Sequence, residues 1–139
     1  MITDDQQAGA NVDLLQSTFE AFNARDIATC LTRLSPDFII NVAGEPGPRY
    51  GHESWRSGVE IINNAFPDLR AEIEDIFGSG DRVAVRLTFR GTHQGDLEGI
   101  PATGRHVTYS SNEIYRVTDG LIAEEWICSD VASLFRQIS

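Results

Sequence analysis

Apolar residues recur with a helical period in the first half of the chain. Between residues 11 and 23 this spacing predicts an amphipathic helix packed on a core. A shorter helix is predicted after Asp26, which can cap it, and Ser35-Pro36 should end it. A third helix is predicted over residues 51–66. The apolar stripes are Val12, Leu15, Phe19 and Phe22 in the first helix and Trp55, Val59, Ile62 and Phe66 in the third.

The apolar period changes to two after Pro67-Asp68, which predicts a run of antiparallel strands. Three helices followed by such a meander, with no β–α–β alternation, indicate an α+β fold in which helices cover one face of a curved, mostly antiparallel sheet. The expected segments are a β-like run at 38–42, a loop at 43–48, a hairpin from Leu69 to Phe89 turning at 78–81, a glycine-rich connection at 91–104, a strand from His106 to Val117, a turn at 118–120, a strand from Ile122 to Cys128 and a helix beginning near Asp130.

Length and charge narrow the class of protein. With 139 residues the chain has the size of one domain, and we expect a single unit over 1–139. A formal net charge of −10 argues against nucleic acid and anionic membranes as partners. Residues 1–7 have neither the basic flank nor the apolar core of an export signal. Cys30 and Cys128 read as core thiols, so a cytoplasmic location is expected.

Short motifs in the second half, in their order and spacing, resemble the SnoaL-like polyketide cyclase family. This family belongs to a superfamily with nuclear transport factor 2, ketosteroid isomerase and limonene epoxide hydrolase. The resemblance implies a cone-shaped α+β barrel, a homodimer formed through the sheet, and an apolar pocket for a hydrophobic polyketide substrate, used without metal or organic cofactor. The motifs are 65–69 (AFPDL), 80–84 (GDRVA), 91–95 (GTHQG), 99–105 (GIPATGR), 115–120 (YRVTDG) and 124–126 (EEW).

The strand from His106 to Val117 is the most informative segment for chemistry. Alternation places Ser111 and Glu113 on its apolar face together with Tyr109 and Tyr115. A carboxylate in such surroundings should have a raised pKa, which suits a general acid or base near neutral pH. The alternative is a structural carboxylate that binds a tyrosine or backbone donor, or one that reaches solvent at the sheet edge.

The family's aldol cyclases carry an acid–base Asp at the position that matches Ile127, a His at that of Glu113 and a Gln at that of Ser111. None of the three is retained, so the aldol mechanism does not carry over directly. Proton transfer would then fall to Glu113 or, on the neighbouring strand, to Glu125. If Ile127 faces the cavity, the period of two places Glu125 there as well.

Further candidates complete the predicted site, each with a structural alternative. Asn41 and Tyr109 could donate hydrogen bonds to an oxyanion, although Asn41 could equally serve a turn or cap. His93 could carry protons or tie a loop to the backbone. The three histidines and two distant cysteines show no metal-ligand spacing. Aromatic residues that could form a substrate-stacking wall, or simply belong to the core, are Trp55, Phe66 and Tyr50.

These features leave three functions open. The first is a cyclase or isomerase of natural-product biosynthesis, in which Glu113 or Glu125 moves a proton and Asn41, Tyr109 or Ser111 stabilises an enolate or alkoxide. The second is a cofactor-independent hydroxylase that binds a phenolic or quinol substrate as its anion and lets oxygen attack. The third is a binding module without turnover. Fold alone does not choose among them.

Overall fold

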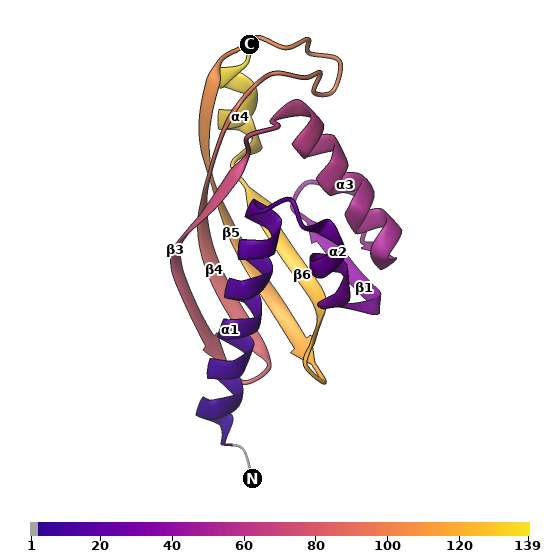
Figure 1. The fold of residues 1–139 in the computed structure, drawn as a ribbon, viewed down its shortest axis with the longest axis vertical. Coiled ribbons are helices and arrows are strands. Elements are labelled where there is room, and N and C mark those ends of the chain that lie inside the picture. Colours follow the sequence, from indigo (N-terminus) through magenta and orange to yellow (C-terminus); the bar gives the residue numbers. More distant parts are fainter. Residues whose placement is uncertain (1–2) are drawn as a thin grey trace.

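The computed structural model describes residues 3–139, so Met1 and Ile2, the start of the N-terminal segment considered above, lie outside the described residues. The helices pack on one face of a six-stranded mixed sheet (Figure 1). The helices are α1 (Asp4–Asn23), α2 (Ile27–Thr32), α3 (Gly51–Ala65) and α4 (Val131–Gln137), and the strands are β1 (Leu34–Val42), β2 (Arg49–Tyr50), β3 (Arg70–Ser79), β4 (Arg82–Thr92), β5 (His106–Thr118) and β6 (Leu121–Ser129). None of the helices within residues 3–139 has the length and apolar character needed to cross a membrane.

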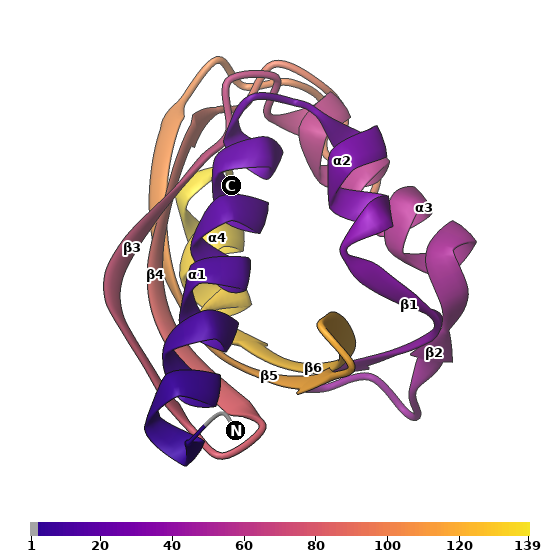
Figure 2. The same cartoon turned by 60° about the horizontal axis from the view of Figure 1, so that its bottom comes forward.

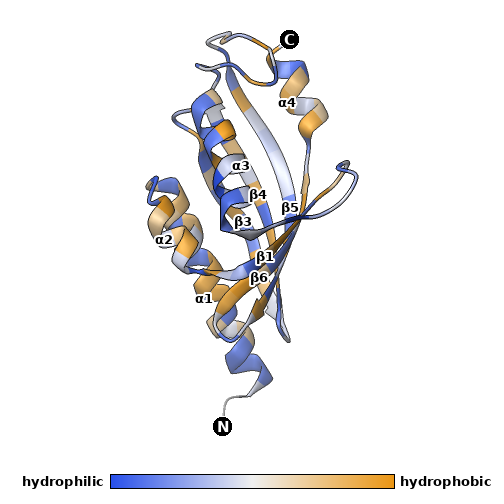
Figure 3. Cartoon of the chain, turned by 90° about the vertical axis from the view of Figure 1, so that its right-hand side faces the viewer, coloured by the Kyte–Doolittle hydropathy of each residue, from blue (hydrophilic) through white to orange (hydrophobic). Residues whose placement is uncertain are grey.

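Capping residues set the helix starts. Thr3 and Gln6 form a capping box, so α1 begins at Asp4 and not at residue 11. The first turns of α1 are hydrophilic, and apolar residues gather farther along the helix (Figure 3). The apolar period therefore did not reveal that these first turns are helical. The Asp26 side chain accepts a hydrogen bond from the Thr29 N–H at 3.1 Å, which confirms the predicted cap of α2.

The segment around Pro36 belongs to a strand. Helix α2 ends at Thr32, and β1 begins at Leu34, so the prediction that the helix runs on to Ser35-Pro36 was wrong. The register between β1 and β6 shifts between Leu34 and Ile39. Proline, which has no N–H, is tolerated at such an irregularity, and it favours an extended conformation in the residue before it.

The sheet has the strand order β2-β1-β6-β5-β4-β3. Strand β1 runs parallel to β6, whereas the other pairs are antiparallel, so the predicted curved and mostly antiparallel sheet is confirmed. Strand β2 was not predicted, since two residues carry no periodicity. The sheet stays open at β2 and β3 and curves around the helices, which complete a cone (Figure 2).

Alternation sorts β4 and β5 into a covered and an uncovered face, as predicted. In β6 a register shift opposite Arg116 and Val117 places Ile122 and Ala123 both in the interior. Beyond it Cys128 pairs with Asn112 on the uncovered face and is exposed, so the prediction of a core thiol was wrong there. Cys30, by contrast, is fully buried.

Candidate active site

A cavity of about 370 Å³ lies between the helices and the face of the sheet that they cover. This volume is in the range of small-molecule sites. Its wall is mainly apolar and aromatic. Strands β5 and β6 contribute Tyr109, Glu113, Tyr115, Glu125 and Ser129 to its polar lining, and the other polar residues are Thr18, Glu45, Arg49, Ser54 and Glu98. Wall residues from the helices and from β1 and β4 include Phe19, Phe22, Trp55, Ile62, Phe38, Ile40 and Phe89.

Two carboxyl groups, those of Glu113 and Glu125, line this cavity. Their exposed fractions are 5% and 4%. Glu125 lies directly opposite Tyr115 across the β5–β6 ladder, and Glu113 lies opposite Ile127. All four side chains line the cavity, so the sequence-based expectation that Ile127 and Glu125 share a face is confirmed.

Hydroxyl groups hold the Glu113 carboxylate from two sides. The Ser111 hydroxyl donates to Glu113 Oε2 at 2.6 Å, and the Tyr115 hydroxyl donates to Glu113 Oε1. The oxygens of Ser111 and Ser129 are 2.8 Å apart. Because the single proton of Ser111 goes to Glu113, Ser129 must be the donor in that pair. The chain of donors therefore runs from Ser129 through Ser111 to Glu113.

The two carboxyl groups hold protons differently. Burial raises the pKa of Glu113, against which the hydrogen bonds from Ser111 and Tyr115 favour its ionised form. Burial, followed by the charge of Glu113, raises the pKa of Glu125 to about 8, while Tyr115 and the charge of Arg49 lower it in part. Because the charge of Glu113 contributes to the raised pKa of Glu125, Glu113 ionises first, and Glu125 keeps its proton at neutral pH next to a carboxyl group that accepts two hydrogen bonds.

Tyr109 presents a neutral donor to the same cavity. Its ring stacks on Phe89 with 5.2 Å between the centroids and 16° between the planes. Burial, followed by the charge of Glu113, raises the pKa of Tyr109, so its hydroxyl keeps its proton. No side-chain hydrogen bond within residues 3–139 occupies this hydroxyl, which leaves it free for a ligand.

The remaining substrate-binding candidates occupy different places. Trp55 and Ile127 line the cavity. Ser111 is 1% exposed and lies behind Glu113, to which its proton is committed. Phe66 is fully buried and packs against the His93 ring at 5.4 Å, outside the cavity wall. Tyr50 precedes α3 with an exposed fraction of 62% and does not line the cavity.

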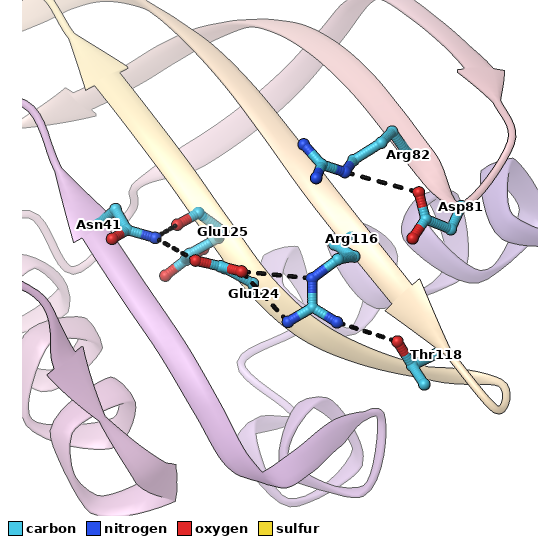
Figure 4. Close-up of polar contacts among 7 residues, drawn as sticks. All are labelled: Asn41, Asp81, Arg82, Arg116, Thr118, Glu124 and Glu125. Atoms are coloured by element: carbon cyan, nitrogen blue, oxygen red, sulfur yellow. Dashed lines mark hydrogen bonds and ion pairs between the residues drawn. The ribbon is translucent and has the colours of Figure 1, made fainter.

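Asn41 lies on the uncovered face of the sheet, where it pairs in register with Trp126. Its Nδ2 donates to Glu124 Oε2 at 3.0 Å and to the Glu125 main-chain oxygen at 2.9 Å (Figure 4). Glu124 in turn accepts hydrogen bonds from Arg116 at 3.1 and 3.2 Å. This arrangement points the Asn41 amide away from the cavity and supports β6 from outside.

His93 is fully buried at the base of the loop between β4 and β5. Its Nδ1 accepts a hydrogen bond from the Thr103 N–H at 3.2 Å and lies 2.9 Å from the Thr103 hydroxyl. Its main chain pairs with Arg105 and Gly104. The ring thus ties the loop together, as in the structural alternative, and it does not line the cavity. Among residues 3–139 no group of three His, Cys, Asp or Glu side chains is arranged to hold a metal ion.

The sequence did not single out every residue of the site, and Ser129 and Leu97 are two of those it missed. Ser129 lies opposite Ser111 in register and lines the cavity. Because Ser129 lies two residues after Ile127, alternation places both on the same face of β6. Ser129 could have been predicted if that face had been known to line the cavity. Leu97, 5% exposed, lines the cavity from the β4–β5 loop. Loop residues follow no apolar period, so no signal in the sequence marks it.

The sequence profile of the SnoaL-like polyketide cyclase family matches residues 12–138 of this chain. The chain belongs to this family. The family predicted from the motifs is thereby confirmed. Aklanonic acid methyl ester cyclase DnrD from Streptomyces peucetius is 28% identical over 130 residues, which cover 91% of this chain and 89% of DnrD.

Solved structures of SnoaL-like proteins share the fold. IdmH, a proposed polyketide cyclase from Streptomyces antibioticus, is 34% identical with a TM-score of 0.82, covering 92% of this chain and 97% of IdmH. AclR, a proposed hydroxylase from Streptomyces galilaeus, is 28% identical with a TM-score of 0.86, covering 94% of this chain and 82% of AclR. Proteins similar to this chain thus include some described as cyclases and one described as a hydroxylase.

Proposed function

We propose that this SnoaL-like protein is a cofactor-free acid–base enzyme of polyketide biosynthesis that cyclises or isomerises a hydrophobic polycyclic or polyketide substrate. One observation carries the proposal: Glu113 and Glu125 line the same apolar cavity, Glu113 accepts two hydrogen bonds that favour its ionised form, and the pKa of Glu125 is raised to about 8. A base and an acid in one largely apolar cavity are what enolate chemistry requires.

The reaction would remove one proton from a carbon atom of the substrate and add one proton to an oxygen atom. Glu113 takes a proton from the carbon next to a carbonyl group, and Glu125 gives its proton to the oxygen on which charge develops. The free Tyr109 hydroxyl stabilises that oxygen, and loss of one such donor costs roughly 3 to 4 kcal/mol in other enzymes. The enolate carbon then attacks a second carbonyl group in a cyclase or regains a proton at a different position in an isomerase.

The relatives support this reaction class, since DnrD bears the name of a cyclase. We propose that Ile127 occupies the place of the aldol cyclases' Asp and that Glu113, its partner across the ladder, takes over the role of base. The Glu113–Glu125 pair would thus replace a single acid–base residue.

A cofactor-independent hydroxylase is the second candidate, and the similarity to AclR favours it. In this reaction Glu113 would deprotonate a phenolic or quinol substrate, and the resulting electron-rich anion would react with molecular oxygen. Such chemistry needs the base but not the protonated Glu125. The effect of removing Glu125 therefore separates the two candidates.

Incubation of the purified protein with aromatic polyketides, beginning with aklanonic acid methyl ester, tests both. An isomeric product of unchanged mass supports the cyclase or isomerase, a product heavier by oxygen supports the hydroxylase, and binding without product supports a non-catalytic module.

Glu113→Gln should lower turnover by about 100-fold or more. Glu124→Gln is the matched control, because Glu124 is the neighbour of Glu125 but hydrogen bonds to Asn41 and Arg116 on the uncovered face. Equal activity of Glu113→Gln and the wild type would refute the acid–base proposal.

We further propose that residues 1–139 form one domain that works in the cytoplasm as a homodimer. An apolar hollow on the uncovered face of the sheet supports the dimer. Phe77 and Ile114 lie there with exposed fractions of 65% and 44%. Apolar side chains clustered at the surface favour burial against a second copy.

A further inference from the structure

Tyr115 occupies a central position between the two carboxyl groups. Its side chain lies on the same face of β5 as Glu113 and directly opposite Glu125 of β6. Side chains directly opposite each other in an antiparallel pair have Cβ atoms about 4.5 to 5.5 Å apart. The ring is 6% exposed and packs edge-on against Phe19, with 6.1 Å between the centroids. The hydroxyl is therefore held in place before any ligand enters.

The hydrogen bonds fix the route along which a proton can move between the two carboxyl groups. Tyr115 gives its only proton to Glu113, so its oxygen retains lone pairs that can accept. Ser111 also donates to Glu113, and Ser129 to Ser111, so no other group of this network offers Tyr115 a proton. The neighbour that holds a proton at neutral pH is Glu125, and Tyr115 itself stays protonated because burial and the two carboxylates raise its pKa.

We propose that Tyr115 is a positioning residue that joins Glu113 and Glu125 into one acid–base pair and passes a proton between them through its hydroxyl. After turnover Glu113 carries the proton and Glu125 is ionised. The O–H bond of Glu113 then breaks as a new O–H bond forms on Tyr115, and the original Tyr115 proton moves to Glu125. One proton is transferred in total, Tyr115 ends neutral, and no oxidation occurs. This transfer returns the pair to its starting state after turnover, with Glu125 again the acid and Glu113 again the base.

The link is tested without substrate by measuring carboxyl pKa values with ¹³C-glutamate NMR. Each carboxyl group is followed alone, Glu113 in Glu125→Gln and Glu125 in Glu113→Gln. Adding Tyr115→Phe should raise the remaining pKa by about 1 unit in both backgrounds, since a donor to the ionised form is lost. Tyr109→Phe is the matched control, because Tyr109 lies on the same strand and face without a hydrogen bond to either carboxyl group. A rise in only one background, or an equal rise with Tyr109→Phe, would overturn the proposal.

Fluorotyrosine provides a second measurement should Tyr115→Phe fold poorly. The chain has three tyrosines, so uniform 3-fluorotyrosine labelling gives three ¹⁹F signals that single substitutions assign. The Tyr115 signal should change at the pKa of both carboxyl groups. It should lose one step in Glu113→Gln and the other in Glu125→Gln. A signal that follows only one carboxyl group contradicts the link.

The use of the link in turnover rests on the proposed function. With a substrate in hand, Tyr115→Phe should complete a first turnover and then slow by about 10-fold or more in the steady state, because the pair resets poorly. A purely structural role would slow both phases equally. If the titrations link both carboxyl groups to Tyr115 but the wild type turns over none of the substrates, the proposed function fails and the link stands.

Discussion

Glu113 of β5 and Ile127 of β6 are direct partners across the antiparallel ladder, and both side chains line the cavity. In the proposed function, Ile127 occupies the place of the acid–base Asp that the resemblance assigns to the aldol cyclases. In our proposal the carboxylate has moved across the ladder to the neighbouring strand, a shift of about 5 Å between Cβ positions. The cavity stays the same, whereas the direction from which a base reaches the substrate changes.

Ile127→Asp should show how this cavity tolerates a further acid. The new carboxyl group would face Glu113, so each should hinder ionisation of the other. We expect a loss of about 3 kcal/mol in the free energy of unfolding at pH 8 and a smaller loss at pH 5, where the introduced carboxyl group would keep its proton. Urea unfolding at both pH values measures this, with Ile127→Asn as the uncharged control. Equal losses for Ile127→Asp at the two pH values would contradict it.

Stability of the wild type should fall as pH rises from about 4.5 to about 8. The pKa of Glu125 is raised from 4.5 to about 8, so in this window the folded protein holds a proton that the unfolded chain has released. The contribution is complete below the unfolded pKa and lost above the folded one. It is at most about 5 kcal/mol, since one pKa unit corresponds to about 1.4 kcal/mol. Urea unfolding across this range should show a flatter profile for Glu125→Gln, and an unchanged slope would be inconsistent with a protonated Glu125.

Asn41→Ala should act on stability through β6. It removes hydrogen bonds to the Glu124 carboxylate and to the Glu125 carbonyl oxygen, which should cost about 1 to 2 kcal/mol. Thermal unfolding measures the loss. Ligand affinity, compared at a temperature where both proteins are folded, should change little because the amide points away from the cavity. A large fall in the ligand affinity of Asn41→Ala would show instead that Asn41 contacts the ligand, as the sequence suggested.

Gly95→Ala should loosen the loop that covers the cavity. A Cβ atom at this position would lie 2.2 Å from the Asn64 main-chain oxygen, a contact that backbone atoms can relieve only by moving. We expect a loss of about 2 to 4 kcal/mol in the free energy of unfolding. Gly47→Ala is the control, since a Cβ atom there meets nothing within 4 Å. Thermal unfolding measures the loss. Equal melting temperatures for Gly95→Ala and Gly47→Ala would argue against the close approach at Gly95.

Ile114→Asp should separate the proposed dimer. The side chain is exposed on the uncovered face, so an added charge does not disturb the interior. Light scattering coupled to gel filtration should give the dimer mass for the wild type and the monomer mass for this variant, with thermal stability of the monomer as the control for folding. A monomeric wild type at tens of micromolar would remove the dimer from the proposal.

Much of the site could be predicted from alternation along β5. Tyr109, Glu113 and Tyr115 share a face because successive side chains of a strand point to opposite sides, and no distant residue alters that rule. Asn41 and Cys128 show its limit. Each lies in a predicted strand, yet which face of that strand the helices cover depends on the register with its neighbours, and this register is a property of the whole sheet.

Apart from the short strand β2, the order of helices and strands follows from the sequence alone, as do the cap of α2, the α+β class and the apolar face of β5. These features rest on local periodicity and on hydrogen bonds between residues close in the chain. Only the tertiary structure decided that Glu125 lies opposite Tyr115, that Ser129 donates to Ser111 and that Leu97 reaches the cavity from a loop. These contacts join strands and loops distant in sequence, and their geometry is set by ladder register and by packing against the helices, neither of which a local pattern records.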